Sequence, residues 1–184
     1  MTLIRKSIKW AAGMLRVALA RASSRGRVEI EGGRPLYLGK GARLSVDEGA
    51  TCRIGAGVYL SAGCIVEVLP GASLSLGDGV YMNEGCRVVA AASVEVGSGT
   101  ISGPDVKVCD HDHSFDADGV HAELVASLVS IGEGCWLGAN SIVTRGVRVA
   151  DRCLVSAGAV VTQNCAESAV LYGGVPAVPL KRFE

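Results

Sequence analysis

The sequence predicts an all-β solenoid of parallel coils, preceded by one helix and interrupted by one long loop. Composition, a six-residue period and one long interruption of that period lead to this class. Of the 184 residues, 49% are hydrophobic and 25 are glycine, whereas aromatic residues make up only 4%. A core with so few rings has to be filled by Val, Ile, Leu, Ala and Cys, which suits stacked short strands better than a helical globule.

Aliphatic residues recur at six-residue spacing in four runs, which are Ile54-Leu60-Val66, Leu76-Met82-Val88, Val96-Val108 with Ser102 between them, and Ile131-Leu137-Val143-Val149-Val155-Val161. Six residues match neither the alternation of a strand nor the turn of a helix. They fit one face of a triangular coil, made of a short strand and a tight turn, so three faces give a coil of about 18 residues. Glycine follows the first member of each run, at a position that we expect to need positive φ.

The seven cysteines do not indicate disulfides or zinc. No C-x-x-C pair occurs, and an odd count leaves one thiol over in any complete disulfide scheme. The slot two residues before the periodic aliphatic holds Cys52, Cys64, Cys86, Cys135 and Cys153, and Cys165 continues the spacing of this slot beyond the last aliphatic. We predict that these are buried free thiols, since cysteine packs as a small, soft hydrophobe. Cys109 lies outside the pattern, and ordinary packing is its simplest role.

The chain divides into a basic amphipathic helix with its connector (1–27) and a β-helix domain (28–184). Within this domain, residues 166–184 leave the repeat and are expected to cap the last coil. Helical periodicity over 2–22 places Arg5, Lys6, Lys9 and Arg16 opposite a broad apolar face. Such a helix is typical of a membrane-surface anchor, of a packing or oligomer contact, or of a signal peptide, and the sequence leaves all three open. No stretch reaches the ~20 apolar residues of a membrane-spanning helix. A formal net charge of zero gives no indication of nucleic-acid binding.

All three histidines, His111, His113 and His121, fall in the loop 109–128, where the six-residue period is absent. Long polar loops inserted into a regular scaffold usually carry function. An imidazole is suited to take the proton of a hydroxyl nucleophile. A neighbouring carboxylate, from Asp110, Asp112 or Asp116, could hold the ring in the required tautomer.

Over residues 36–182, the [LIV]-G-x-x-x-x repeat resembles the hexapeptide-repeat acyltransferases. The resemblance implies a left-handed parallel β-helix, acetyl-CoA as co-substrate, no metal, and a homotrimer with active sites between subunits. The segment His113-Ser114-Phe115-Asp116 is similar to the His-Pro-x-Asp segment of the maltose and galactoside acetyltransferases and of polysaccharide O-acetyltransferases. His113 is therefore the preferred catalytic residue and His111 the second candidate.

Further residues match the family pattern one by one. Asn83, in Tyr81-Met82-Asn83, resembles the asparagine that contacts the acceptor, and Asp110 is assigned with it to the substrate. The turns that contain Ala139, Ala157 and Thr162 resemble those that contact pantetheine, and Lys181 matches a basic residue that binds the CoA phosphates. The chain departs from the family at Gln163 and Val178, where a cation is usual, and at 90–92, where three alanines replace an acid.

The function expected from the sequence is acetyl transfer from acetyl-CoA to a sugar hydroxyl, without a covalent intermediate. The acceptor would be a surface polysaccharide or its lipid-linked precursor, handled in the cytoplasm with contact to the inner face of the membrane through residues 2–22. Another acceptor, such as serine, an antibiotic or an amino sugar, is an alternative on the same fold. A zinc hydratase using the three histidines and a non-catalytic β-helix for binding or assembly are alternatives from other classes.

Overall fold

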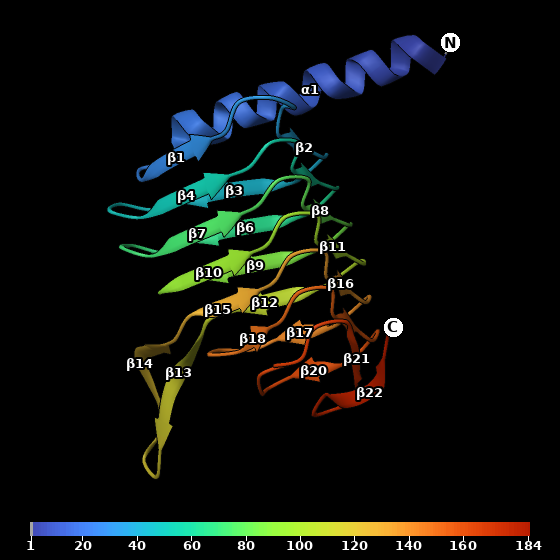
Figure 1. Ribbon diagram of the computed structural model, residues 1–184. Coiled ribbons are helices and arrows are strands. Elements are labelled where there is room, and N and C mark those ends of the chain that lie inside the picture. Colours follow the sequence, from blue (N-terminus) through green and yellow to red (C-terminus); the bar gives the residue numbers. More distant parts are fainter. Residues whose placement is uncertain (1) are drawn as a thin grey trace.

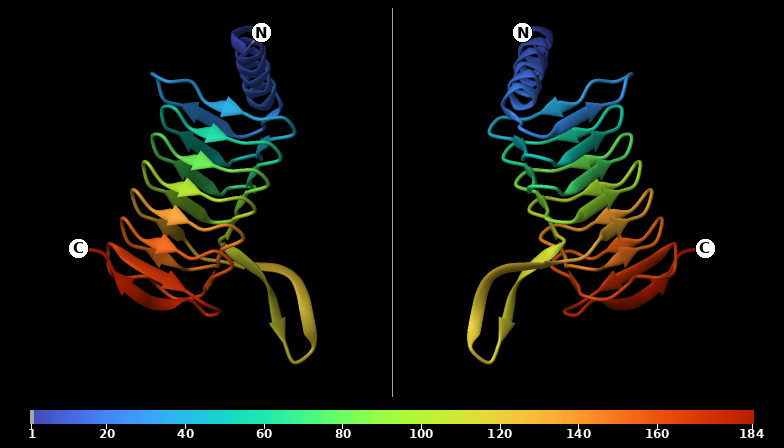
Figure 2. Two further views of the ribbon diagram at one scale, coloured as in Figure 1. Left: turned by 90° about the vertical axis from the view of Figure 1, so that its right-hand side faces the viewer. Right: turned by 90° about the vertical axis from the view of Figure 1, so that its left-hand side faces the viewer.

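The computed structural model describes residues 2–184, with side chains from Trp10 onward, and consists of a parallel β-solenoid with one helix across its N-terminal end (Figure 1). This architecture confirms the fold class predicted from the sequence. Helix α1 is Thr2–Ser23. Figure 2 shows the coils stacked along one axis, with a hairpin projecting from the side of the stack.

Three sheets, here named A, B and C, form the faces of the solenoid, and the chain visits them in this order in each coil. All their strand pairs are parallel except the last pair of sheet B, β21 with β22. Sheet A contains β1 (Arg27–Ile30), β4 (Thr51–Ile54), β7 (Ser73–Leu76), β10 (Ser93–Val96), β15 (Val129–Ile131) and β18 (Arg148–Val149). Sheet B contains β2 (Tyr37–Leu38), β5 (Tyr59–Leu60), β8 (Tyr81–Met82), β11 (Ile101–Ser102), β16 (Trp136–Leu137), β19 (Leu154–Val155), β21 (Val170–Gly173) and β22 (Val178–Arg182). Sheet C contains β3 (Arg43–Val46), β6 (Ile65–Val68), β9 (Arg87–Ala90), β12 (Lys107–Cys109), β17 (Ile142–Val143) and β20 (Val160–Val161).

The length of a coil changes along the solenoid. Tyr37 pairs with Tyr59, 22 residues further on, whereas Trp136 pairs with Leu154, 18 residues further on. The expected length of about 18 residues is therefore right only for the C-terminal coils. The N-terminal coils are longer because their strands in sheets A and C have four residues instead of two or three.

The periodic aliphatic residues point into the solenoid and form its core, where Ile54, Leu60 and Val66 are fully buried. The six cysteines predicted to be core thiols are buried and free. Burial raises the pKa of Cys52 and Cys165 to about 12, because a thiolate loses its hydration inside the stack. The thiols of Cys52 and Cys165 are therefore neutral packing groups at physiological pH.

The glycines after the first aliphatic of each run have a different cause from the one expected. Gly97 has an ordinary φ, but a Cβ on it would lie 2.5 Å from the backbone carbon of Gly132 in the next coil. Positive φ falls two residues later, as at Gly99 with a φ of 69°. Close approach of successive coils therefore excludes a side chain at the first position, and turn geometry favours glycine at the second.

Helix α1 packs on the first coil through its small and aliphatic face. Val17 is buried, a Cβ on Gly13 would lie 2.5 Å from the ring of Tyr37, and the Arg16 guanidinium donates to the Leu38 carbonyl at 3.0 Å. Leu15 and Leu19 of the same helix are about 60% exposed. The side chains of Arg5, Lys6 and Lys9 lie outside the described residues, so the basic face of the helix stays a sequence-based expectation. Among the described residues, no helix is long and apolar enough to cross a bilayer.

Candidate active site

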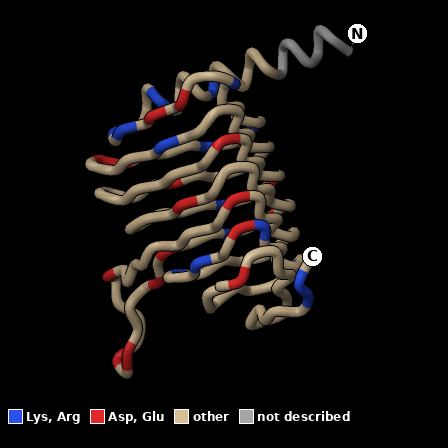
Figure 3. Tube along the Cα trace, in the orientation of Figure 1, with Lys and Arg blue, Asp and Glu red and all other residues tan. Residues whose placement is uncertain are grey.

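The loop that interrupts the period is a β-hairpin, although the sequence analysis described it only as a polar loop. Strands β13 (His111–Asp116) and β14 (Gly119–Ala126) pair antiparallel where sheet C passes into sheet A. Ala117 and Asp118 form the turn, and Gly119, at a φ of 109°, begins β14 opposite Asp116. The Asp118-Gly119 dipeptide between two β-prone segments was the signal that could have predicted the hairpin. The acids at the hairpin tip are the red cluster at the lower end of Figure 3.

Asp110 anchors the base of the hairpin to the coil above. Its carboxylate is fully buried and accepts the backbone N–H groups of Ala91, Ala92 and Ser93 at 2.7, 2.8 and 2.7 Å. The Asp110 carbonyl also accepts the N–H of Ser127 at 2.8 Å, which ties the two ends of the insertion together. The structure thus places Asp110 beneath the site surface, with its acceptor oxygens already used by the protein.

His111 lies at the base of the hairpin with both ring nitrogens near protein atoms. Nδ1 is 3.0 Å from Oδ1 of Asp110, and the side chain is only 16% exposed. The Cys109 sulfur lies 3.4 Å from Nδ1 and 3.7 Å from Nε2. Burial raises the pKa of this half-exposed thiol, so it is protonated next to the ring.

His113 stands further along the same strand and is exposed. Its Nδ1 lies 3.1 Å from the backbone carbonyl of His121, which can only accept, so Nδ1 carries the proton in this hydrogen bond. In the neutral ring Nε2 then holds the free lone pair and faces away from that contact. His113 is consequently better placed than His111 to remove a proton from a molecule outside the hairpin.

Two charged contacts support the hairpin on either side of His113. Arg145, from the turn after β17, donates to Asp112 at 2.8 Å, and Nε2 of His121 lies 2.9 Å from Asp116. The contact with His121 lowers the pKa of the exposed Asp116 carboxyl. The contact between Arg145 and Asp112 holds the hairpin against the coil below. The contact between His121 and Asp116 joins the two strands of the hairpin in its outer half.

The remaining predicted residues lie mostly at another corner of the triangle, where sheet B passes into sheet C. Ala139 and Ala157 follow β16 and β19 there and stack directly, since the N–H of Gly158 donates to the Ala139 carbonyl at 2.8 Å. Asn83 follows β8 at the same corner, two coils above Ala139. Its side-chain oxygen accepts the N–H of Glu84 at 2.8 Å, which leaves the amide N–H₂ group for another partner.

Thr162 and Lys181 complete the set. Thr162 is exposed in the turn after β20, at the same corner as the hairpin, and Lys181 is exposed on β22 at the end of sheet B. The structure thus brings Asn83, Ala139 and Ala157 to one corner and the histidines with Thr162 to another. Sheet C separates the two corners within one chain, and in Figure 1 the hairpin and the short strands of sheet B lie on opposite sides.

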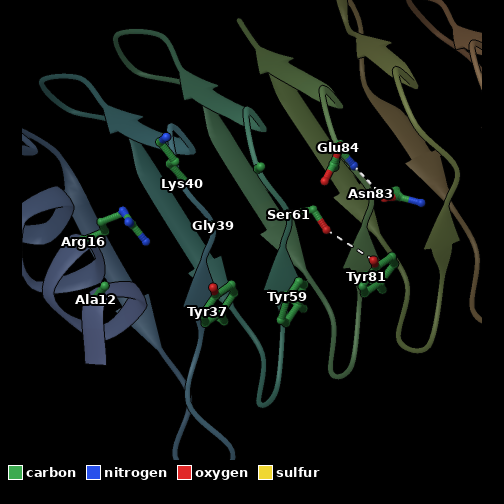
Figure 4. A pocket seen from close by; sticks show the side chains of 11 residues that line it. Ala12, Arg16, Tyr37, Gly39, Lys40, Tyr59, Ser61, Tyr81, Asn83 and Glu84 are labelled. Atoms are coloured by element: carbon green, nitrogen blue, oxygen red, sulfur yellow. Dashed lines mark hydrogen bonds between the residues drawn. The ribbon is translucent and has the colours of Figure 1, made fainter. Parts of the chain in front are cut away.

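A groove of about 480 Å³ runs from Asn83 to helix α1 along the corner where sheet B passes into sheet C (Figure 4). Tyr37, Tyr59 and Tyr81 form one side as a ladder, with ring centroids 4.4 and 5.3 Å apart. Ser61 donates to the Tyr81 hydroxyl at 3.3 Å. The sequence analysis missed this groove, although the 22-residue spacing of the three tyrosines was a signal that could have found it.

Among the side chains that the structure describes, no group of three His, Cys, Asp or Glu residues is arranged to hold a metal ion. The three histidines do not converge, because His111 contacts Asp110, His113 contacts a backbone carbonyl and His121 contacts Asp116. The described geometry therefore offers no support for a zinc centre built from them.

Comparison with known proteins gives a family match and a distant relative. The family described as the hexapeptide repeat of succinyl-transferase matches residues 128–163. A Schizosaccharomyces pombe protein that carries the name acetyltransferase is 29% identical over 94 residues, which are 50% of this chain and 45% of the relative. The matched part thus spans less than half the length of that relative.

Solved structures share the fold at low identity. An N-acyltransferase from Bacillus cereus, AntD, in complex with dTDP and coenzyme A, has a TM-score of 0.69 and 14% identity, with 91% of this chain and 89% of that chain covered. A maltose O-acetyltransferase from Clostridium difficile has a TM-score of 0.57 and 19% identity, with 92% and 75% covered. The family match shows hexapeptide repeats over residues 128–163, and the solved structures show that the chain has the left-handed β-helix fold of these acyltransferases.

Proposed function

We propose that the protein is an acetyl-CoA-dependent O-acetyltransferase that acts on a sugar hydroxyl, with His113 as the general base. The observation that carries this proposal is the orientation of His113. Its Nδ1–H donates to the His121 carbonyl, so Nε2 is left without a protein contact from that bond and is available to an acceptor hydroxyl. The acceptor oxygen attacks the thioester carbonyl as Nε2 takes its proton. Collapse of the tetrahedral intermediate expels the CoA sulfur, which leaves as the thiol with that proton. No acyl-enzyme is formed.

We assign coenzyme A to the corner between sheets B and C, where Ala139 and Ala157 lie. Ala139 and Ala157 form a stacked pair without bulky side chains, against which an extended pantetheine arm can lie. Thr162 would contact the same arm from the hairpin corner, and Lys181 would attract the CoA phosphates by charge. Coenzyme A bound to AntD and the O-acetyl chemistry named for the maltose enzyme are consistent with this assignment.

In one chain, sheet C separates Asn83, at the corner between sheets B and C, from His113, at the corner between sheets C and A. A site that contains both residues would therefore need a second copy of the chain. We therefore propose a homotrimer in which the alanine corner of one subunit faces the hairpin of the next. Ile101 and Trp136 are adjacent in the register of sheet B, beside the alanine corner, and are 49% and 55% exposed. Two large apolar side chains side by side on an open face are suited to a protein contact.

Trp136→Glu is expected to convert the trimer to monomers, because a carboxylate would have to be desolvated in the contact. The mass in solution, measured by analytical ultracentrifugation, should fall to that of one chain, and acetyl transfer should fall with it. Leu15→Glu on helix α1, where the side chain is equally exposed but lies away from sheet B, is the matched control. A Trp136→Glu protein that keeps the mass of three chains would contradict this interface.

The acceptor that we propose is a surface polysaccharide or its lipid-linked precursor, acetylated in the cytoplasm near the inner membrane face. The exposed apolar side of α1, which includes Leu15 and Leu19, supports a contact with the membrane. Co-sedimentation with anionic lipid vesicles, before and after deletion of residues 1–27, tests that contact. Unchanged recovery after the deletion would remove it.

Calorimetric titration with acetyl-CoA tests the enzyme class directly. We expect micromolar binding to both the wild type and His113→Ala, because the base is assigned to the acceptor and not to the cofactor. Loss of binding in a Lys181→Ala protein would support the phosphate assignment. Failure of the wild type to bind acetyl-CoA would contradict the proposed function.

A further inference from the structure

The groove beside the tyrosine ladder has opposite charges at its two ends. Lys40 is exposed at the end next to helix α1, and Arg16 of that helix lines the same end. One nitrogen of the Arg16 guanidinium is used by the Leu38 carbonyl, and within the described residues neither cation has an ion-pair partner. Glu84 and Asn83 line the other end (Figure 4). The groove therefore has one cationic end and one end at the predicted acceptor residue.

The distance between these ends follows from the coil geometry. Lys40, Ala62 and Glu84 occupy the same turn position in three successive coils, since the N–H of Gly63 donates to the Lys40 carbonyl and that of Gly85 to the Ala62 carbonyl, each at 3.0 Å. Adjacent coils are ~4.8 Å apart, so the cationic end is about 10 Å from the Asn83 end. This is about the span of a hexose joined to a diphosphate.

Hydroxyl-bearing side chains lie along the wall between the two ends. The hydroxyls of Tyr59 and Tyr81 and that of Ser61 line it, and Ser61 donates to Tyr81, so the Tyr81 proton is left for another acceptor. Burial raises the pKa of Tyr59, which keeps its hydroxyl protonated. The walls thus offer hydroxyl donors to an extended polar molecule.

We propose that this groove binds the phosphate-bearing part of the acceptor, with the phosphates on Lys40 and Arg16 and the sugar directed toward Asn83. The assignment of the sugar to the Asn83 end rests on the proposed function, whereas the assignment of an anion to Lys40 and Arg16 does not. Lys40 and Arg16 supply charge-assisted hydrogen bonds to phosphate oxygens. The ligand chemistry is a sugar linked to phosphate, carried either by a nucleotide or by a lipid.

Pyrophosphate is the first probe, titrated into the full-length protein and followed by calorimetry at low and high salt. Lys40→Ala should weaken pyrophosphate binding by about fivefold or more, since it removes one direct cation from an anion held in a groove. Lys107→Ala, which removes an exposed lysine from sheet C, is the matched control and should leave the affinity unchanged. UDP-glucose and geranyl diphosphate then distinguish the two sources, because the tighter of the two identifies a nucleotide or a lipid carrier.

Three results would overturn the proposal: no pyrophosphate binding at millimolar concentration, equal effects of Lys40→Ala and Lys107→Ala, or a loss confined to Lys181→Ala. The last result would assign the anion to the predicted CoA phosphate site. Acetyl-CoA binding is measured on the same samples and should be unchanged in Lys40→Ala. A protein that binds pyrophosphate through Lys40 but does not bind acetyl-CoA would refute the proposed function and leave the anion site standing.

Discussion

His113→Ala should lower kcat/KM for acetyl transfer by about 10²- to 10⁴-fold, the usual contribution of a general base. The physical reason is the orientation of the His113 ring. Its Nδ1 is held by the backbone carbonyl of His121, which leaves Nε2 facing outward and able to accept a proton. Release of the CoA thiol in the presence of an acceptor measures the rate. Binding of acetyl-CoA should not change, so the loss should appear in the chemical step.

Two further variants make this result specific. Phe115→Ala removes a 77% exposed side chain from the same strand and should keep the wild-type rate. His111→Ala removes a ring whose nitrogens lie against Asp110 and Cys109, and should have the smaller effect on the chemical step. If His111→Ala abolished transfer while His113→Ala retained it, the assignment of the base would be reversed.

Asp110→Ala should lower the free energy of unfolding by roughly 3–5 kcal/mol, which is the range for removing one side of a buried charged network. The substitution leaves the N–H groups of Ala91, Ala92 and Ser93 without acceptors inside the protein. Urea denaturation followed by circular dichroism measures the change. Hydrogen exchange should rise at these three amides and across the hairpin.

Asp118→Ala is the matched control for Asp110→Ala. Its carboxylate is at the exposed hairpin tip, and the change should stay within about 0.5 kcal/mol. Asp110→Asn keeps the shape of the side chain but replaces one acceptor oxygen with a donor, so its stability should lie between the two. Equal stability of Asp110→Ala and Asp118→Ala would show that the buried carboxylate does not anchor the hairpin.

The six-residue period was sufficient to predict the solenoid, because each inward aliphatic such as Leu60 marks one face of a coil. The same pattern identified the buried cysteines, since a slot two residues before that aliphatic also points inward. The hairpin was missed because the loss of the period was taken as the signal for a loop, and the Asp118-Gly119 dipeptide, which is typical of hairpins, was not used. The period could not give coil length, which depends on whether strands have two or four residues.

The candidate site was predictable in its residue types but not in its arrangement. Family motifs in the sequence pointed to His113 and Asn83 separately. Their location on different corners depends on the residue count through coils of unequal length and through the insertion, which the period does not supply. The groove could have been found only from the 22-residue spacing of Tyr37, Tyr59 and Tyr81, because the six-residue period does not place Lys40 and Glu84 at one corner, two coils apart.

The stack closes beneath the hairpin as though the insertion were absent. Val94 pairs with Val129 and Lys107 with Ile142, and the ends of the insertion meet through the bond from Ser127 to Asp110. The free energy of closing a loop grows only slowly with its length. The pairing of the coils thus continues past the hairpin, so that changes in the outer part of the hairpin are expected to leave the register of the solenoid unaltered.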